Sequence, residues 1–127
     1  LKLIINYKKK NELIYKYSYY KYYYLSDIIR SYIYNIYNKE IPYSCEIYIN
    51  NIYIINYIYN IYITIYLERI SQKIIFIGYK GNKINYLSNL IKNKFKKIYN
   101  IKNIYLKFNF VIIKWKNNKN YLKMLGY

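Results

Sequence analysis

Residues 71–81 read SQKIIFIGYKG, a short apolar run that ends in a Gly-x-x-Gly loop. Ser71 is a residue type that caps helices, so a helix is expected from there to Ile77, where the first glycine breaks it. Neither glycine carries a Cβ atom, and the backbone of the loop 78–81 can therefore approach a bulky partner closely. The lysine inside the loop adds positive charge at the same place. The segment predicts two helices joined by a loop that suits a nucleic-acid backbone.

The remaining segments supply the elements around this loop. Helical spacing begins at Ser26, a good N-cap, and Pro42 ends the pattern. Two strands are expected before the loop, and a helix and a strand after it, at 44–55, 59–69, 82–98 and 101–114. The order is helix-strand-strand-helix-helix-strand, which predicts an α+β fold with a three-stranded sheet and helices packed on one face.

The apolar side chains recur at every second residue in the expected strands and at helical spacing in the expected helix. In 59–69 they alternate, with Ile61, Ile63, Ile65 and Leu67 on one face. In 101–114 the alternating set is Ile104, Leu106, Phe108, Phe110 and Ile112. The helix 82–98 carries an apolar stripe of Ile84, Leu87, Leu90, Ile91 and Ile98. The hairpin turn is left open between Asn50-Asn51 and Asn56, because neither is followed by glycine.

The chain has 22 Lys and Arg against 5 Asp and Glu, a formal net charge of +17. An excess of this size predicts attraction to RNA, DNA or an anionic membrane, without choosing among them. The 24 tyrosines are weaker evidence of function than the charge, because Ile, Asn, Lys and Tyr can all be encoded by codons of A and U alone. Drift in an AT-rich genome accounts for most of them, and a set of base-stacking platforms is the alternative.

Several kinds of catalytic and metal chemistry are absent from the sequence. It has no histidine and one cysteine, Cys45, which excludes Cys/His zinc sites, histidine-dependent triads and internal disulfides. Its carboxylates are scattered, and no Gly-x-x-x-x-Gly-Lys-Ser/Thr phosphate loop occurs. We expect no enzyme activity, no metal and no cofactor in this chain, with Cys45 a buried strand residue.

The uncharged segment 47–67 is long enough to span a bilayer as a helix. Its second half alternates with period two, which favours a strand over a spanning helix. No secretory signal occurs at residues 1–24, which are basic and aromatic and are interpreted as a connector or arm. The folded domain is placed at 25–116 with Phe108 and Trp115 in its core, and a short tail at 117–127. The sequence does not begin with methionine, so we expect it to be a segment of a longer protein.

The element order with Gly-x-x-Gly between the second and third helices is that of the type II KH domain, a module that clamps about four nucleotides with this loop. Five motifs extend the resemblance: SDIIR at 26–30, KEIPYS at 39–44, LERISQK at 67–73, IGYKG at 77–81 and LGY at 125–127. Together, from about residue 20 onward, they resemble the C-terminal part of the bacterial Era GTPase family. The tetrapeptide Asn82-Lys83-Ile84-Asn85 superficially resembles the Asn-Lys-x-Asp box with which GTPases read guanine, but it lacks the aspartate.

The KH interpretation assigns RNA-binding roles to particular residues. Gly78 and Gly81 allow close approach, and Tyr79 and Lys80 are the variable pair of the loop. The floor and rim of an RNA groove are expected from Ile74, Ile77 and Ile84, and from Arg69, Lys73 and Lys83. Most lysines of the helix 82–98 are interpreted as a solvated face.

The resemblance implies binding of small-subunit (16S) ribosomal RNA near its 3′ end, in ribosome biogenesis. It also implies a cytoplasmic protein with peripheral contact to the inner membrane, and GTP and Mg²⁺ in a parent GTPase domain. Two alternatives are a basic membrane-surface or scaffold protein and a remnant without function. Loss of RNA binding when Tyr79 and Lys80 become acidic separates the RNA-binding hypothesis from the scaffold, and a remnant would not fold cooperatively.

Overall fold

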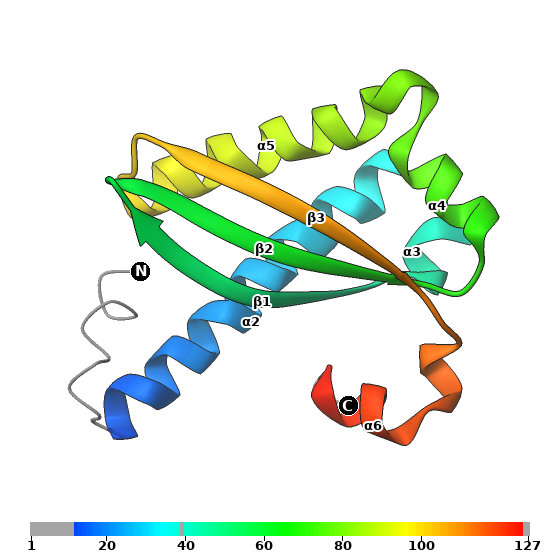
Figure 1. The fold of residues 1–127 in the computed structure, drawn as a ribbon, viewed down its shortest axis with the longest axis horizontal. Coiled ribbons are helices and arrows are strands. Elements are labelled where there is room, and N and C mark those ends of the chain that lie inside the picture. Colours follow the sequence, from blue (N-terminus) through cyan, green and yellow to red (C-terminus); the bar gives the residue numbers. More distant parts are fainter. Residues whose placement is uncertain (1–11, 39, 126–127) are drawn as a thin grey trace.

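The computed structural model describes residues 12–38 and 40–125 (Figure 1). The elements in chain order are α2 (Glu12–Ile36), α3 (Glu40–Ser44), β1 (Glu46–Ile55), β2 (Ile58–Leu67), α4 (Ile70–Ile77), the 3₁₀ turn η2 (Tyr79–Gly81), α5 (Asn82–Tyr99), β3 (Ile104–Ile112), the 3₁₀ turn η3 (Trp115–Asn117) and α6 (Lys119–Met124). The expected α-β-β-α-α-β order is confirmed, with the short helices α3 and α6 in addition.

The three strands form one mixed sheet in the order β1-β2-β3. β1 and β2 pair antiparallel, whereas β2 and β3 pair parallel and are connected through α4 and α5. A parallel pair needs such a crossover, because its strands start at the same end of the sheet. The Gly-x-x-Gly loop is therefore part of the crossover between the two parallel strands.

The open question of the hairpin turn is resolved at Asn56-Tyr57, where both residues have positive φ, of 50° and 65°. Two positive φ values are the pattern of the tight turn that matches strand twist. The other candidate, Asn50-Asn51, is a β-bulge: the pairing register shifts between Ile49 and Asn51. A bulge leaves one extra residue on its strand, so both asparagines interrupt the regular alternation of β1.

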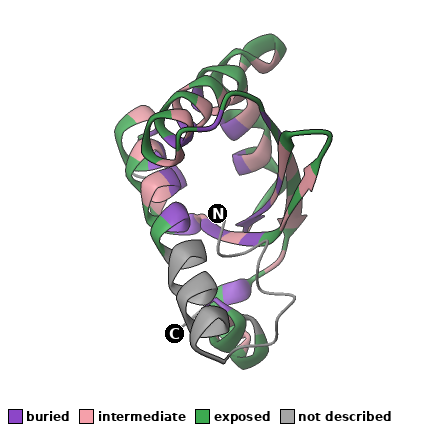
Figure 2. Cartoon of the chain, turned by 90° about the vertical axis from the view of Figure 1, so that its left-hand side faces the viewer, coloured by how far each residue is buried: buried purple, intermediate pink, exposed green. Residues whose placement is uncertain are grey.

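Helices α2, α4 and α5 cover one face of the sheet, as Figures 1 and 2 show. The expected inward set of β2, Ile61, Ile63, Ile65 and Leu67, is fully buried. Leu87 and Ile91 of the predicted α5 stripe are buried as well, together with Phe95, which the prediction omitted. Ile98, by contrast, is partly exposed. The core thus sits between the crossover helices and the sheet, and it holds α4 and α5 in place beside β3.

Two predicted helix starts are wrong. α2 begins at Glu12, and Ser26 is a buried residue inside it rather than its N-cap. No glycine or proline interrupts residues 12–25, so the helix continues through a segment interpreted as an arm. α4 begins at Ile70 with Arg69 as N-cap, and the Oε1 atom of Gln72 accepts hydrogen bonds from the backbone N–H groups of Glu68 and Arg69. Gln72 therefore fixes this helix start.

The C-terminal segment interpreted as a tail is partly folded. Tyr66, Trp115 and Leu125 form a second buried cluster. Tyr66 alternates with the inward residues Ile65 and Leu67, so this cluster lies on the opposite face of the sheet from α5. The indole N–H of Trp115 donates to the carbonyl of Ser44 at 3.2 Å. The core role expected for Trp115 is confirmed, in this second cluster.

The uncharged segment 47–67 forms β1, the turn and β2, as its period-two pattern predicts. Among the described residues, no helix is both long and apolar enough to cross a membrane.

Candidate nucleic-acid interface

The loop between α4 and α5 is stabilised by its own backbone. The N–H of Gly78 donates to the carbonyl of Ile74 at 3.0 Å, and the N–H of Gly81 donates to the carbonyl of Gly78 at 3.1 Å. Gly78, Lys80 and Gly81 have positive φ values of 80°, 51° and 74°. α5 begins at Asn82, directly after the loop, and no side chain caps this end within the described structure. The backbone N–H of Asn82 donates to the carbonyl of Tyr79 within the loop, and the positive end of the dipole of α5 lies at the loop.

The two glycines are needed for different reasons. Gly78 has φ 80° and ψ 176°, a conformation essentially restricted to glycine. A Cβ atom placed on it would lie 2.8 Å from Oδ1 of Asn82 and 2.9 Å from Cβ of Lys83. A Cβ atom on Gly81 would meet only Ile84 and Asn85, at 3.8 and 3.9 Å. Gly78 lets the loop pack against the start of α5, whereas Gly81 supplies only a left-handed backbone turn.

α4 presents opposite faces to the core and to solvent. Phe76 is fully buried and stacks on Tyr37, with ring centroids 4.6 Å apart. Burial raises the pKa of the Tyr37 phenol, which stays protonated and donates a hydrogen bond to the carbonyl of Phe76. On the other face, Ile70 and Ile74 are 67% and 68% exposed. Their spacing of four residues aligns them along one side of the helix.

Tyr79, at the loop itself, is 77% exposed. An exposed apolar strip thus leads from α4 to the loop, with Ile77 half-buried at its end. Ile70 was not among the predicted site residues, although its spacing from Ile74 was visible in the sequence. Ile84 is half-buried and packs against the main core, and its place in a groove floor stays a prediction.

Three lysines of the predicted site lie beside aromatic rings. The Nζ atom of Lys80 is 5.4 Å from the centroid of the Tyr79 ring, that of Lys83 is 5.3 Å from Tyr37, and that of Lys73 is 5.6 Å from Phe110. Such contacts orient an ammonium group without neutralising it. Arg69, at the start of α4, is exposed. The loop and both flanking helices therefore carry positive charge next to exposed apolar side chains.

Three described carboxylates are engaged elsewhere. Asp27 and Glu46 form ion pairs with Arg30, at 2.8 and 2.6 Å, and Glu68 lies 3.8 Å from the ammonium of Lys116. The charge of the loop lysines is not compensated by these three groups. This leaves the loop region as a cationic surface.

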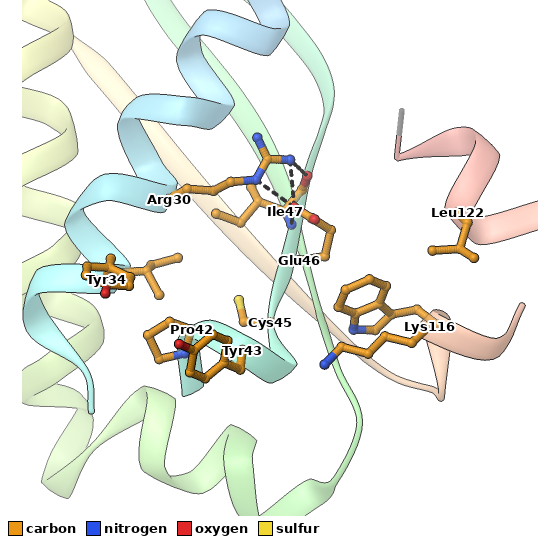
Figure 3. A pocket seen from close by; sticks show the side chains of 11 residues that line it. Arg30, Tyr34, Pro42, Tyr43, Cys45, Glu46, Ile47, Lys116 and Leu122 are labelled. Atoms are coloured by element: carbon orange, nitrogen blue, oxygen red, sulfur yellow. Dashed lines mark hydrogen bonds and ion pairs between the residues drawn. The ribbon is translucent and has the colours of Figure 1, made fainter. Parts of the chain in front are cut away.

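A separate hollow of about 540 Å³ lies between α2, α3, β1 and the C-terminal segment (Figure 3). The Arg30–Glu46 pair and Cys45 line it, together with Trp115 and Leu122. Burial raises the pKa of the Cys45 thiol, which favours the protonated form over the reactive thiolate. The expectation that Cys45 is a buried strand residue is wrong, because Cys45 is partly exposed and lies between α3 and β1. The residues predicted for RNA contact lie outside this hollow.

The order α-β-β-α-α-β, the mixed sheet and the Gly-x-x-Gly loop between α4 and α5 define a type II KH fold. Solved structures of Era contain the same fold. A point variant of Aquifex aeolicus Era bound to GDP·AlF4⁻ matches with a TM-score of 0.74 and 23% sequence identity, over 81% of this chain and 35% of that chain. Era in complex with MgGDPNP and nucleotides 1506–1542 of 16S ribosomal RNA matches with the same values.

No protein-family model and no curated protein sequence matches this chain. The likeness to Era therefore rests on structure and shows the fold. This chain spans about a third of the Era chain, 35% of its length. The fold predicted from the sequence motifs is confirmed.

Proposed function

We propose that this chain is an Era-like KH module that binds single-stranded RNA through the loop 78–81 and the adjoining helices. The observation that carries the proposal is the loop geometry. Gly78 packs so closely on α5 that a side chain has no room, and the next two residues, Tyr79 and Lys80, are exposed to solvent. Uncommon backbone conformations, such as those of Gly78 and Lys80, cluster at ligand-binding sites.

The backbone of the loop and the start of α5 are suited to phosphate groups. The positive end of the dipole of α5 lies at the loop and favours an anion there. Lys80 lies within the loop, and Lys73 and Lys83 flank it on α4 and α5. Arg69, Lys73, Lys80 and Lys83 would then hold successive phosphates, which positions RNA without reading its sequence.

The exposed strip on α4 is suited to the bases. Ile70, Ile74 and Ile77 offer an apolar surface along the helix, and Tyr79 adds an aromatic ring at its end. Single-stranded bases that leave water gain by contact with such side chains. In this arrangement the phosphates face the loop and α5, while the bases lie along α4.

For the target, we propose the 3′ region of the small-subunit ribosomal RNA and a role in assembly of that subunit. The support is the fold shared with Era, one structure of which contains nucleotides 1506–1542 of 16S ribosomal RNA. GTP binding would belong to a parent protein, because the sequence here lacks a phosphate loop. The described residues hold no group of three acidic, histidine or cysteine side chains for a metal ion.

A competition experiment tests this function. A labelled RNA with the 3′-terminal segment of 16S ribosomal RNA should stay bound in a filter assay when excess bulk tRNA is added. With three or four phosphates neutralised, the affinity should fall with salt at a logarithmic slope of about −2 to −3. If tRNA and anionic vesicles displace the RNA equally well, the chain is a general polyanion-binding protein, and the proposal is wrong.

A further inference from the structure

The sheet has a second hollow, of about 490 Å³, on its face away from the crossover helices. Figure 2 shows the helices on one side of the sheet, and no described helix lies over the middle of the other side. The lining consists of amide, hydroxyl and aromatic side chains with one lysine and one isoleucine: Asn50, Asn51, Tyr53, Tyr62, Ile63, Thr64, Lys107 and Asn109. This face is built from the strands alone and shares no residue with the loop site.

The strand registers explain why polar residues gather here. Tyr62 pairs with Asn51 on β1 and with Lys107 on β3, and Thr64 pairs with Asn109. These residues alternate with the buried isoleucines of β2, so they share the outward face. The bulge adds Asn50 to the same face, where its Oδ1 atom accepts a hydrogen bond from the Thr64 hydroxyl at 2.5 Å. Two consecutive asparagines thereby lie over one surface.

The aromatic side chains of this face are held in a fixed arrangement. Tyr53 and Tyr62 meet edge to face, with ring centroids 5.8 Å apart. The ammonium of Lys107 lies 6.0 Å from the Tyr62 ring centroid. Tyr53 is half exposed, and Tyr105, which also points outward on β3, is 51% exposed. Rings with a lysine beside them, on an open sheet, are the arrangement on which single-stranded bases stack.

We propose that this open sheet face is a second binding surface for single-stranded RNA. Bases would stack on Tyr62 and Tyr53, and Lys107 would meet a phosphate. The amides of Asn50, Asn51 and Asn109 both donate and accept hydrogen bonds, as the edges of bases require. Charge complementarity favours RNA over a protein partner, because the lining contains a lysine and no carboxylate and the chain carries +17 overall.

Fluorescence anisotropy with a labelled oligouridylate of about 12 nucleotides, long enough for a sheet platform, tests this surface. Tyr62→Leu removes the ring but keeps apolar bulk, and we expect about 10-fold weaker binding. Tyr62→Phe keeps the ring and should bind within about 2-fold of the parent chain. Tyr43→Leu, at a 66% exposed tyrosine on α3, is the matched control and should bind like the parent. Equal affinity for Tyr62→Leu and the parent would overturn the proposal.

Lys107→Gln is a second probe, because its exposed side chain is not needed for folding. It should reduce the salt slope of binding by about 1, and an unchanged slope argues against the phosphate contact and the surface.

A combined variant separates the two proposed RNA surfaces. Tyr62→Leu added to a chain with an acidic loop (Tyr79→Asp with Lys80→Glu) should lower the remaining RNA affinity further. If the acidic loop alone binds normally while Tyr62→Leu does not, the loop proposal fails and the sheet proposal stands. The reverse result overturns only the sheet proposal.

Discussion

Replacing Tyr79 by Asp together with Lys80 by Glu is expected to weaken RNA binding by at least about 100-fold. Tyr79 is 77% exposed and Lys80 is exposed, so neither substitution disturbs the core. Loss of one base-stacking ring costs about 1–3 kcal/mol. Loss of a charge-assisted hydrogen bond to phosphate costs about 1.5–3 kcal/mol, to which the new carboxylates add repulsion. The measurement is the dissociation constant of a short single-stranded RNA at moderate salt.

The control for this experiment has the same change in net charge at a different place. Asn93→Asp with Lys94→Glu alters two exposed residues in the C-terminal half of α5. It should weaken binding only a few-fold, through the long-range field of the protein. Equal losses in both double variants would mean that total charge, and not the loop, determines RNA affinity.

Gly78→Ala is expected to destabilise the protein by about 3 kcal/mol, whereas Gly81→Ala costs about 1 kcal/mol. Both glycines have positive φ, but only at Gly78 does the new Cβ atom meet neighbours below 3 Å. The contacts are with Asn82 and with the Cβ and Cγ atoms of Lys83. Because Lys83 is anchored on α5, its Cβ atom cannot rotate away, and the loop must open instead.

Thermal unfolding followed by circular dichroism measures this difference. The melting temperature of Gly78→Ala should fall by roughly 10 °C, and that of Gly81→Ala by only a few degrees. RNA affinity should be lost in Gly78→Ala even at temperatures where the fold is intact, because the loop backbone has moved. Equal stability of the two variants would show that the packing of Gly78 on α5 is not as described.

Much of the fold could be predicted because its signals are local. The period-two pattern of Ile61 to Leu67 follows from a strand with one buried face, and the stripe of Leu87 and Ile91 follows from a helix on a core. The Gly-x-x-Gly loop then fixes where two helices meet. These features depend on residues close in sequence, and the structure confirms them.

The wrong predictions have two causes, a competing local signal at the helix starts and a contact with a distant partner at the C-terminus. Ser26 and Ser71 are good caps in isolation, yet Ser26 is buried inside a longer helix and Gln72 supplies the contacts at the start of α4. The folding of the C-terminal segment depends on Trp115 reaching Ser44, 71 residues earlier in the chain. No local pattern encodes such contacts.

Some residues of the candidate site could likewise be predicted from the sequence, and others could not. The loop and Ile74 could be predicted from spacing, because they occupy one short helix and its end. The degree of burial of Ile84 could not be predicted, since it depends on how α5 packs against the rest of the core. The outward sheet face was not predicted to be a binding surface. Asn50 and Asn51 share that face only through a bulge, and that bulge follows from the pairing of β1 with β2.

The central claim is that RNA contacts the backbone of residues 78–81 and the first turn of α5. Titration of the ¹⁵N-labelled protein with a short single-stranded RNA, followed by amide NMR shifts, tests it most directly. We expect the largest shifts at the amides of Gly78 to Lys83, with smaller ones along α4. Shifts spread over the lysines of the C-terminal half of α5, with the amides of the loop unmoved, would contradict it.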